Sequence, residues 1–159
     1  LITPEVNELL KSTQLPGMRV LQFGFGSEAD DFHRPDQFPP HSVAYTGTHD
    51  NDTLLGWYRN YLADPNQLDV VTPYLRNFLD AYPDLAKRPL HWQLIAAVLH
   101  SASNSAIVPV QDILGLGNEA RMNVPGEAKG NWAWRLHEGQ LTSETSRQLF
   151  DLVIESGRG

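Results

Sequence analysis

The sequence predicts an α/β fold with parallel strands that is part of a larger barrel, and three observations support that prediction. Predicted helices and short apolar strands alternate along the chain, a pattern typical of β-α-β units whose strands run parallel. Only three strands are found in 159 residues, whereas a closed parallel barrel needs eight strands and about 250 residues. The first residue is Leu1 rather than Met, which fits a piece of a longer protein. We therefore expect residues 1–159 to be the C-terminal portion of one barrel domain.

The composition excludes several classes of protein. With 41% hydrophobic and 19% charged residues, the chain is expected to fold around a core rather than remain disordered. Nineteen acidic against twelve basic residues give a net charge of −7, which excludes nucleic acid as a partner because that binding depends on cationic contacts. The longest apolar run, 94–99, is far shorter than the ~20 residues of a membrane span. The absence of cysteine excludes disulfides and thiolate metal sites and favours a cytoplasmic location.

Four elements are expected in the first 46 residues. Thr3 as N-cap and Pro4 at the first helical position predict a helix that ends near 15–17. Mostly apolar runs at 18–23 and 42–46 predict two strands. The segment between them is rich in proline and acidic residues, and we expect it to be a long loop.

Helices are expected to dominate the rest of the chain, with one further strand. A helix with Asp52 as its N-cap should run to about 62, and another within 66–81 should restart at Thr72 and Pro73, since proline favours the first helical turn. An apolar face predicts a packed helix over 90–103. A third strand is expected at 106–110, a glycine-containing loop at 111–131, and a last helix from Thr142 or Ser143 to about 157.

A polar cluster follows the second predicted strand, where α/β folds place their catalytic groups. It consists of His49, Asp50, Asn51 and Asp52. Helix capping alone would explain Asp52 but would leave His49 and Asp50 without a role, so we predict that Asp50 is catalytic. A calcium loop is excluded, because its fifth position is Leu54 and no glutamate stands at its twelfth. The histidines lack the spacing of a zinc site, and we expect neither a metal nor a cofactor.

Two further patterns are less specific. The run 115–120 fits a dinucleotide-binding fingerprint, but Pro125 would soon break the helix that such a site requires. A glycine-hinged loop at the mouth of a site is the better interpretation. Trp132 and Trp134 alternate with other residues in a way that fits either a half-buried strand or a platform for stacking on sugar rings.

Several longer motifs occur together at compatible spacing. They are ITPEV at 2–6, PGMRVLQF at 16–23, YTGTHDNDT at 45–53, QDILGLG at 111–117, EARMN at 119–123, PG at 125–126 and GNWAWR at 130–135. In this order, the motifs closely resemble those of the amylomaltases, the 4-α-glucanotransferases that are also called disproportionating enzymes. The resemblance covers most of the chain.

The resemblance implies a TIM (β/α)8 barrel of the α-amylase type, with 18–23, 42–46 and 106–110 as its last three strands. It also implies an enzyme that transfers α-1,4-glucan segments with retention of the anomeric configuration. Retention requires a nucleophilic carboxylate, a second carboxyl that acts as acid and then as base, and a covalent glycosyl-enzyme intermediate. In the family both groups lie upstream of the position of Leu1, so we expect this chain alone to be inactive.

By the same resemblance, four residues are assigned to the site. Asp50 matches the third family carboxylate, which binds the sugar beside the reacting centre and stabilises the oxocarbenium-like transition state. His49 matches the neighbouring histidine that binds the same glucose. Phe23 is similar to an aromatic residue near the active site, and Asn123 falls in the mobile loop that covers the bound glucan. The implied partners are α-1,4-glucans, maltooligosaccharides and glucose.

Two other functions remain open from the sequence. A hydrolase of the same superfamily would use the same carboxylates but pass the sugar to water, and the difference depends on how well the site excludes water. A non-catalytic glucan-binding module would keep the aromatic surface. The intact pair of His49 and Asp50 argues against such a module, since binding alone needs no transition-state carboxylate.

Overall fold

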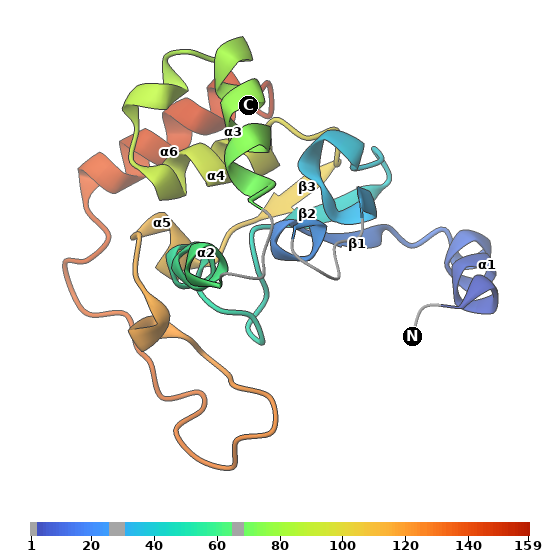
Figure 1. Cartoon of the computed structure of the whole chain (residues 1–159), viewed down its shortest axis with the longest axis horizontal. Helices are drawn as coiled ribbons and strands as arrows, with labels where there is room; N and C mark the ends of the chain where they lie inside the picture. Colours follow the sequence, from blue (N-terminus) through green and yellow to red (C-terminus); the bar gives the residue numbers. More distant parts are fainter. Residues whose placement is uncertain (1–2, 26–30, 65–68) are drawn as a thin grey trace.

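The computed structural model describes residues 3–25, 31–64 and 69–159 and has the predicted alternation of helices and strands (Figure 1). The strands are β1 (Gly17–Val20), β2 (Ser42–Tyr45) and β3 (Ser105–Ile107). The α-helices are α1 (Pro4–Thr13), α2 (Leu54–Ala63), α3 (Val71–Ala81), α4 (Leu90–Leu99), α5 (Val110–Ile113) and α6 (Ser143–Glu155). Short 3-10 helices are η1 (Leu21–Gly24), η2 (Asp31–His33), η3 (Pro35–Gln37), η4 (Leu85–Lys87) and η5 (Asn118–Ala120).

The three strands form one parallel sheet in the order β1-β2-β3. Val43, on the central strand, pairs with Met18 on one side and with Ser105 on the other. Because all three strands run in the same direction, their carboxyl ends lie at one edge of the sheet. The prediction of an α/β fold with parallel strands is confirmed, and this edge is where such folds place their sites.

Helix α4 is the centre of the hydrophobic core. It contacts α2, α3, α5, α6 and strand β2. Trp92 and all of 94–99 are buried on it, and Ala44 of β2 is fully buried in the same core. The longest apolar run of the sequence is therefore a core helix. None of the helices in the described residues is long and apolar enough to cross a membrane.

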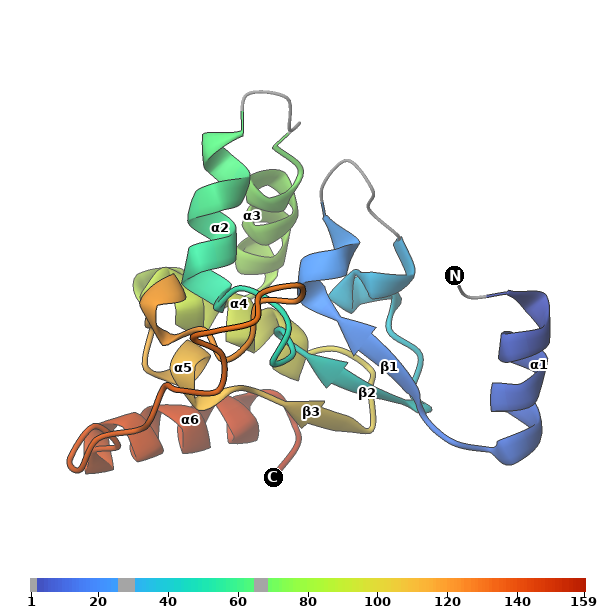
Figure 2. The ribbon, with the colours of Figure 1, turned by 90° about the horizontal axis from the view of Figure 1, so that it is seen from below.

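Helix α1 lies away from α2–α6, at the far end of the molecule (Figures 1 and 2). Its start is as predicted, with Thr3 in an extended conformation before Pro4 in the first turn. Leu9 is 63% exposed, so this helix buries little of its apolar face against the described residues. Its local start signals define the helix, and Gln14 ends it in a left-handed conformation.

The first predicted strand is longer than the observed one, because the chain leaves the sheet after Val20. The N–H of Val20 donates to Nδ1 of His33 at 3.0 Å. The next residues form η1, in which Gln22 is buried and donates from Nε2 to the carbonyl of Asp52 at 2.9 Å. Contacts with segments distant in sequence thus convert 21–24 from the predicted strand into a 3-10 turn.

The third strand and the core helix also end earlier than predicted. Pro109 lacks an N–H and stands at the N-cap of α5, which begins within the predicted strand. Helix α4 ends at Leu99, where the guanidinium of Arg158 donates to the carbonyls of Leu99, Ser101 and Ser103. Those carbonyls gain a side-chain donor in place of further helical hydrogen bonds.

The remaining elements agree with the sequence patterns. The predicted loop between the first two strands contains η2 and η3, although 26–30 lie outside the described residues. Helix α3 starts afresh at Val71, while 66–68 lie outside the described residues. Helix α6 begins as predicted, with Oγ1 of Thr142 accepting the N–H of Thr145 at 3.1 Å.

Candidate functional site

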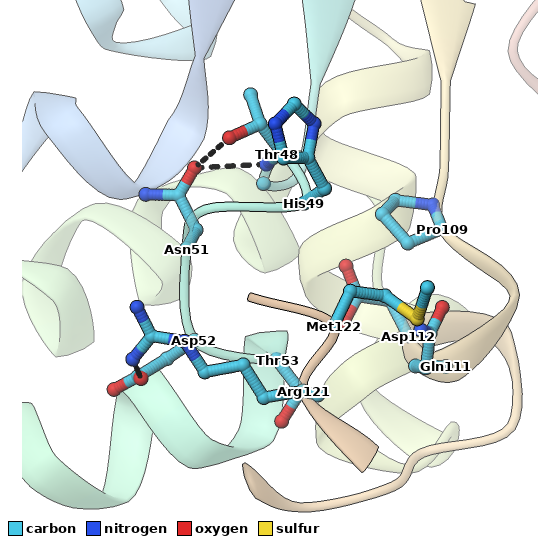
Figure 3. A pocket seen from close by; sticks show the side chains of 11 residues that line it. Thr48, His49, Asn51, Asp52, Thr53, Pro109, Gln111, Asp112, Arg121 and Met122 are labelled. Atoms are coloured by element: carbon cyan, nitrogen blue, oxygen red, sulfur yellow. Dashed lines mark hydrogen bonds and ion pairs between the residues drawn. The ribbon is translucent and has the colours of Figure 1, made fainter. Parts of the chain in front are cut away.

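An open hollow lies at the carboxyl edge of the sheet (Figure 3). The turn that follows β2, the start of α5 and the chain after η5 line it. The lining residues are Gly47, Thr48, His49, Asn51, Asp52, Thr53, Pro109, Gln111, Asp112, Arg121 and Met122. The polar cluster found in the sequence is therefore part of a concave site.

Asn51 holds the turn in shape. Its Oδ1 accepts the N–H and the hydroxyl of Thr48 at 2.8 and 2.7 Å (Figure 3), and its own N–H donates to the Thr48 carbonyl at 3.2 Å. His49 and Asp50 lie between these two residues, with 57% and 50% of their side chains exposed. The turn thus presents an imidazole and a carboxylate on a fixed backbone where a ligand can reach them.

Asp50, His49 and Asn123 come together in this site. His49 Nε2 lies 3.2 Å from Asp50 Oδ1, and Asn123 Nδ2 donates to the same oxygen at 2.6 Å. The N–H of Asn123 donates to the carbonyl of His49 at 3.1 Å, which joins the two segments through their backbones as well. All these contacts to the Asp50 carboxylate use Oδ1. The cluster combines acceptors and donors suited to binding hydroxyl groups.

Phe23, the fourth predicted site residue, lies apart from this cluster of contacts. It belongs to η1, just beyond the carboxyl end of β1, and is 48% exposed. Its ring packs edge-on against His33 with the centroids 5.5 Å apart. Phe23 shares the carboxyl edge of the sheet with the cluster, but its contact is with the chain that follows β1.

Arg121 joins the turn after β2 to the segment that carries Asn123. Its guanidinium forms an ion pair with Asp52, toward which it points in Figure 3, and donates to the Asp50 carbonyl at 2.6 Å. It also donates to the Asn123 carbonyl at 2.8 Å. The Arg121 and Asp52 side chains are only 21% and 19% exposed. Because the pair is shielded from water and its members make further hydrogen bonds, it should contribute more to stability than an exposed ion pair.

The predicted N-cap of α2 is wrong by one residue. Thr53 caps the helix, since its Oγ1 accepts the N–H of Gly56 at 3.2 Å. The N–H of Thr53 in turn donates to Oδ1 of Asn118 at 3.1 Å. The Asp52 carboxylate instead takes part in the ion pair and accepts from Nδ2 of Asn60 at 3.0 Å. Its role is therefore to connect segments rather than to start the helix.

The buried side chain of Asp112 connects the end of β2 to the start of α2. It is only 2% exposed, and its two oxygens accept from the hydroxyl of Thr46 at 2.6 Å and from the N–H of Leu54 at 2.7 Å. Burial raises the pKa of the Asp112 carboxyl, while the hydrogen bonds from Leu54 and Thr46 oppose that shift. The carboxylate thus fixes the distance between the end of β2 and the start of α2.

The sequence did not indicate a role for Arg121 or Asp112, and it did not indicate that Trp132 lies against His49. Asp112 follows the third predicted strand directly, and the rule that selected Asp50 at a strand end also applies to it. Arg121 stands in one of the recognised motifs, but its partners lie 69 and 71 residues away in the chain. No local pattern indicates such a pairing.

The glycine-containing segment forms a loop, as the better of its two interpretations predicted. Gly115 has a φ of +64°, and the chain after Gly117 forms only the three-residue η5, not the long helix of a dinucleotide site. Within 3–25, 31–64 and 69–159, no group of three or more His, Cys, Asp or Glu side chains is placed to hold a metal ion.

Fold and site together define the class of protein. It is an α/β protein whose carboxylate, imidazole and amide groups gather at the carboxyl ends of parallel strands, the edge at which such folds bind small molecules. Comparison with known sequences gives the particular family. The chain belongs to the 4-alpha-glucanotransferase family, whose sequence profile matches residues 1–142.

Individual relatives agree with this assignment. The chain is 45% identical over 150 residues to a 4-alpha-glucanotransferase of Thermus thermophilus, covering 93% of this chain and 29% of that protein. It is 41% identical over 158 residues to a 4-alpha-glucanotransferase of Synechocystis sp., covering 99% of this chain and 30% of that protein. A solved amylomaltase from Streptococcus agalactiae in complex with acarbose matches the whole chain with a TM-score of 0.84 at 28% identity, over 30% of its own length. The chain thus spans less than a third of these relatives.

Proposed function

We propose that residues 1–159 are the C-terminal portion of the catalytic (β/α)8 barrel of a 4-α-glucanotransferase, with β1, β2 and β3 as its last three strands. Family membership, the parallel sheet and the share of each relative's length that the chain covers support a portion of such a domain. Its C-terminal placement follows from the resemblance of the motifs. The enzyme transfers α-1,4-glucan segments, with maltooligosaccharides and glucose as donors and acceptors. The cysteine-free composition supports a cytoplasmic location.

The observation that carries the proposal is the contact of the Asp50 carboxylate with His49 and Asn123 at the carboxyl edge of the sheet. In the proposed reaction, Asp50 binds hydroxyls of the sugar at the reacting centre. Its negative charge stabilises the positive charge that develops on the ring in the oxocarbenium-like transition state. His49 and Asn123 bind the same glucose, and Phe23 provides an apolar surface nearby.

The covalent chemistry needs two further carboxyl groups, which we place elsewhere in the full-length protein. One attacks the anomeric carbon and forms the glycosyl-enzyme, while the other gives its proton to the departing glycosidic oxygen. The 4-hydroxyl of an acceptor glucan then attacks the same carbon, which releases the first carboxylate, and gives its proton to the second group. Asp50 supplies charge and orientation to both steps, so residues 1–159 alone are inactive in this proposal.

The experiment that tests the proposal is product analysis with maltotriose. The full-length protein should yield glucose together with maltodextrins longer than maltotriose, and residues 1–159 alone should yield neither. Glucose and maltose without longer products would show the hydrolase of the same superfamily. Binding of maltotriose without any turnover would instead show a glucan-binding module. Either of these results would contradict the proposed transfer.

A further inference from the structure

Trp132 adopts a backbone conformation that is unfavourable for its residue type. Its φ is +60°, in the left-handed region that bulky L-residues rarely occupy. Residues held in such conformations persist only where their surroundings dictate them, and they concentrate at ligand-binding sites. The backbone at 132 therefore points to a function of this side chain that outweighs the strain.

Residues 122–132 form a loop whose two ends are joined by hydrogen bonds. The N–H of Trp132 donates to the carbonyl of Met122, which lines the hollow, at 2.6 Å. The Asn131 side chain accepts the N–H of Val124 at 2.9 Å and donates to the carbonyls of Val124 and Glu127 at 3.2 and 2.9 Å. These hydrogen bonds join residues 131 and 132 to residues 122 and 124 on either side of Asn123. Trp132 therefore lies at the edge of the site.

The ring of Trp132 lies against His49 and remains open to solvent. The two ring centroids are 5.1 Å apart with an interplanar angle of 38°. Trp132 is nevertheless 51% exposed, whereas Trp92 in the core is 4% exposed. The indole is therefore not part of the core that the described residues form. It adds a flat apolar surface to a site whose other groups, Asp50 and Asn123, bind hydroxyls.

We propose that Trp132 is a glucan-binding residue whose ring stacks on the apolar face of a glucosyl unit next to the one held by His49 and Asp50. The inference rests on the proposed function and adds a subsite to it. A pyranose presents C–H groups on its faces and hydroxyls around its edge. An exposed indole beside hydrogen-bonding side chains matches both parts, because the aromatic face buries the C–H surface. The alternative of a half-buried strand is excluded, because Trp132 lies outside β1, β2 and β3.

Titration of maltoheptaose into full-length variants tests the stacking directly. Trp132→Leu keeps apolar bulk but removes the ring, and its dissociation constant should rise about tenfold, the effect of losing one aromatic contact. Trp132→Phe keeps a ring and should stay within about threefold of the wild type. Phe150→Leu removes an exposed aromatic ring on α6, which does not line the hollow, and this control should bind as the wild type does.

A glycine variant separates binding from structural support. Trp132→Gly relieves the left-handed backbone, so its melting temperature should be no lower than that of the wild type, while maltoheptaose binding weakens as in Trp132→Leu. A clear drop in melting temperature with unchanged binding would show a structural role and overturn the inference.

The outcomes also distinguish this inference from the proposed function. Glucan transfer by the wild type, with Trp132→Leu binding maltoheptaose equally well, would overturn the stacking role and leave the function in place. Weakened binding in Trp132→Leu without glucan transfer by the wild type would support the stacking role and contradict the function. A wild type that does not bind maltoheptaose would overturn both.

Discussion

Asp112 provides the strongest test of how the site is held together. Asp112→Ala removes the acceptor of two buried groups, the N–H of Leu54 and the hydroxyl of Thr46, both in residues with no exposed surface. A buried donor left without a partner costs about 1–3 kcal/mol, so the variant should lose about 2–6 kcal/mol of unfolding free energy. Asp112→Asn should lose only about 1 kcal/mol. Its Oδ1 still accepts from Leu54, and the Thr46 hydroxyl can rotate to accept from Nδ2.

The pH dependence of the same variants follows from the raised pKa of Asp112. Between its unfolded and folded pKa values the folded protein binds more protons than the unfolded chain, so the stability due to this group falls as the pH rises through that interval. Asp112→Asn has no such titration. The stability gap between wild type and Asp112→Asn should therefore be wider near the usual carboxyl pKa of about 4 than at neutral pH.

Two assays on the full-length protein check these values. Urea denaturation should rank the variants as wild type, Asp112→Asn and Asp112→Ala in falling order, with the exposed Asp151→Ala on α6 close to the wild type. Hydrogen exchange in peptides covering 46–56 should accelerate most in Asp112→Ala. Equal stability of the two Asp112 variants, or unchanged exchange in those peptides, would contradict the role of the Asp112 carboxylate as the acceptor for Thr46 and Leu54.

Three further predictions concern other contacts. Arg121→Lys keeps the charge but loses the planar fork that reaches three partners, so kcat for glucan transfer should fall about 10- to 100-fold with little change in melting temperature. His100→Phe should raise the melting temperature, because Nε2 of His100 is buried without a hydrogen-bond partner among the described residues. Burial also lowers the pKa of His100 below 6.5, so the wild type should lose stability as the pH falls through about 6.5, and the variant should lose less. Gly56→Ala would bring a Cβ into steric conflict with Oδ1 of Asn118, so the unfolding free energy measured by urea denaturation should fall by about 1–3 kcal/mol.

Local patterns in the sequence were sufficient to predict the three strands and α1, α2, α3, α4 and α6, but not the ends of several of them or the short helix α5. The apolar run at 18–23 indicates a strand, but the observed strand ends at Val20. There the N–H of Val20 donates to His33, and the Gln22 side chain donates to the carbonyl of Asp52. Both hydrogen bonds join residues more than ten positions apart, so the run alone does not predict them. The early end of β3 is different, because Pro109 stands inside the predicted strand and proline disfavours a central strand position.

The candidate site was predictable where it depends on strand ends. Asp50 and His49 follow the second strand, and the structure brings the side chain of Asn123 into contact with Asp50. The contacts of Arg121 were not predictable, since they connect segments about 70 residues apart. The left-handed backbone of Trp132 was not predictable either, because residue type argues against it.

In the proposed mechanism the charge of Asp50 stabilises the transition state of glucan transfer, and a variant without this charge tests that role. Asp50→Asn removes the charge but keeps Oδ1 as the acceptor for Asn123, so the contacts of the cluster are preserved. In the full-length protein acting on maltotriose, kcat should fall at least about 100-fold with an unchanged melting temperature, while Asp151→Asn should behave as the wild type. Disproportionation by Asp50→Asn within a few-fold of the wild-type rate would contradict that role.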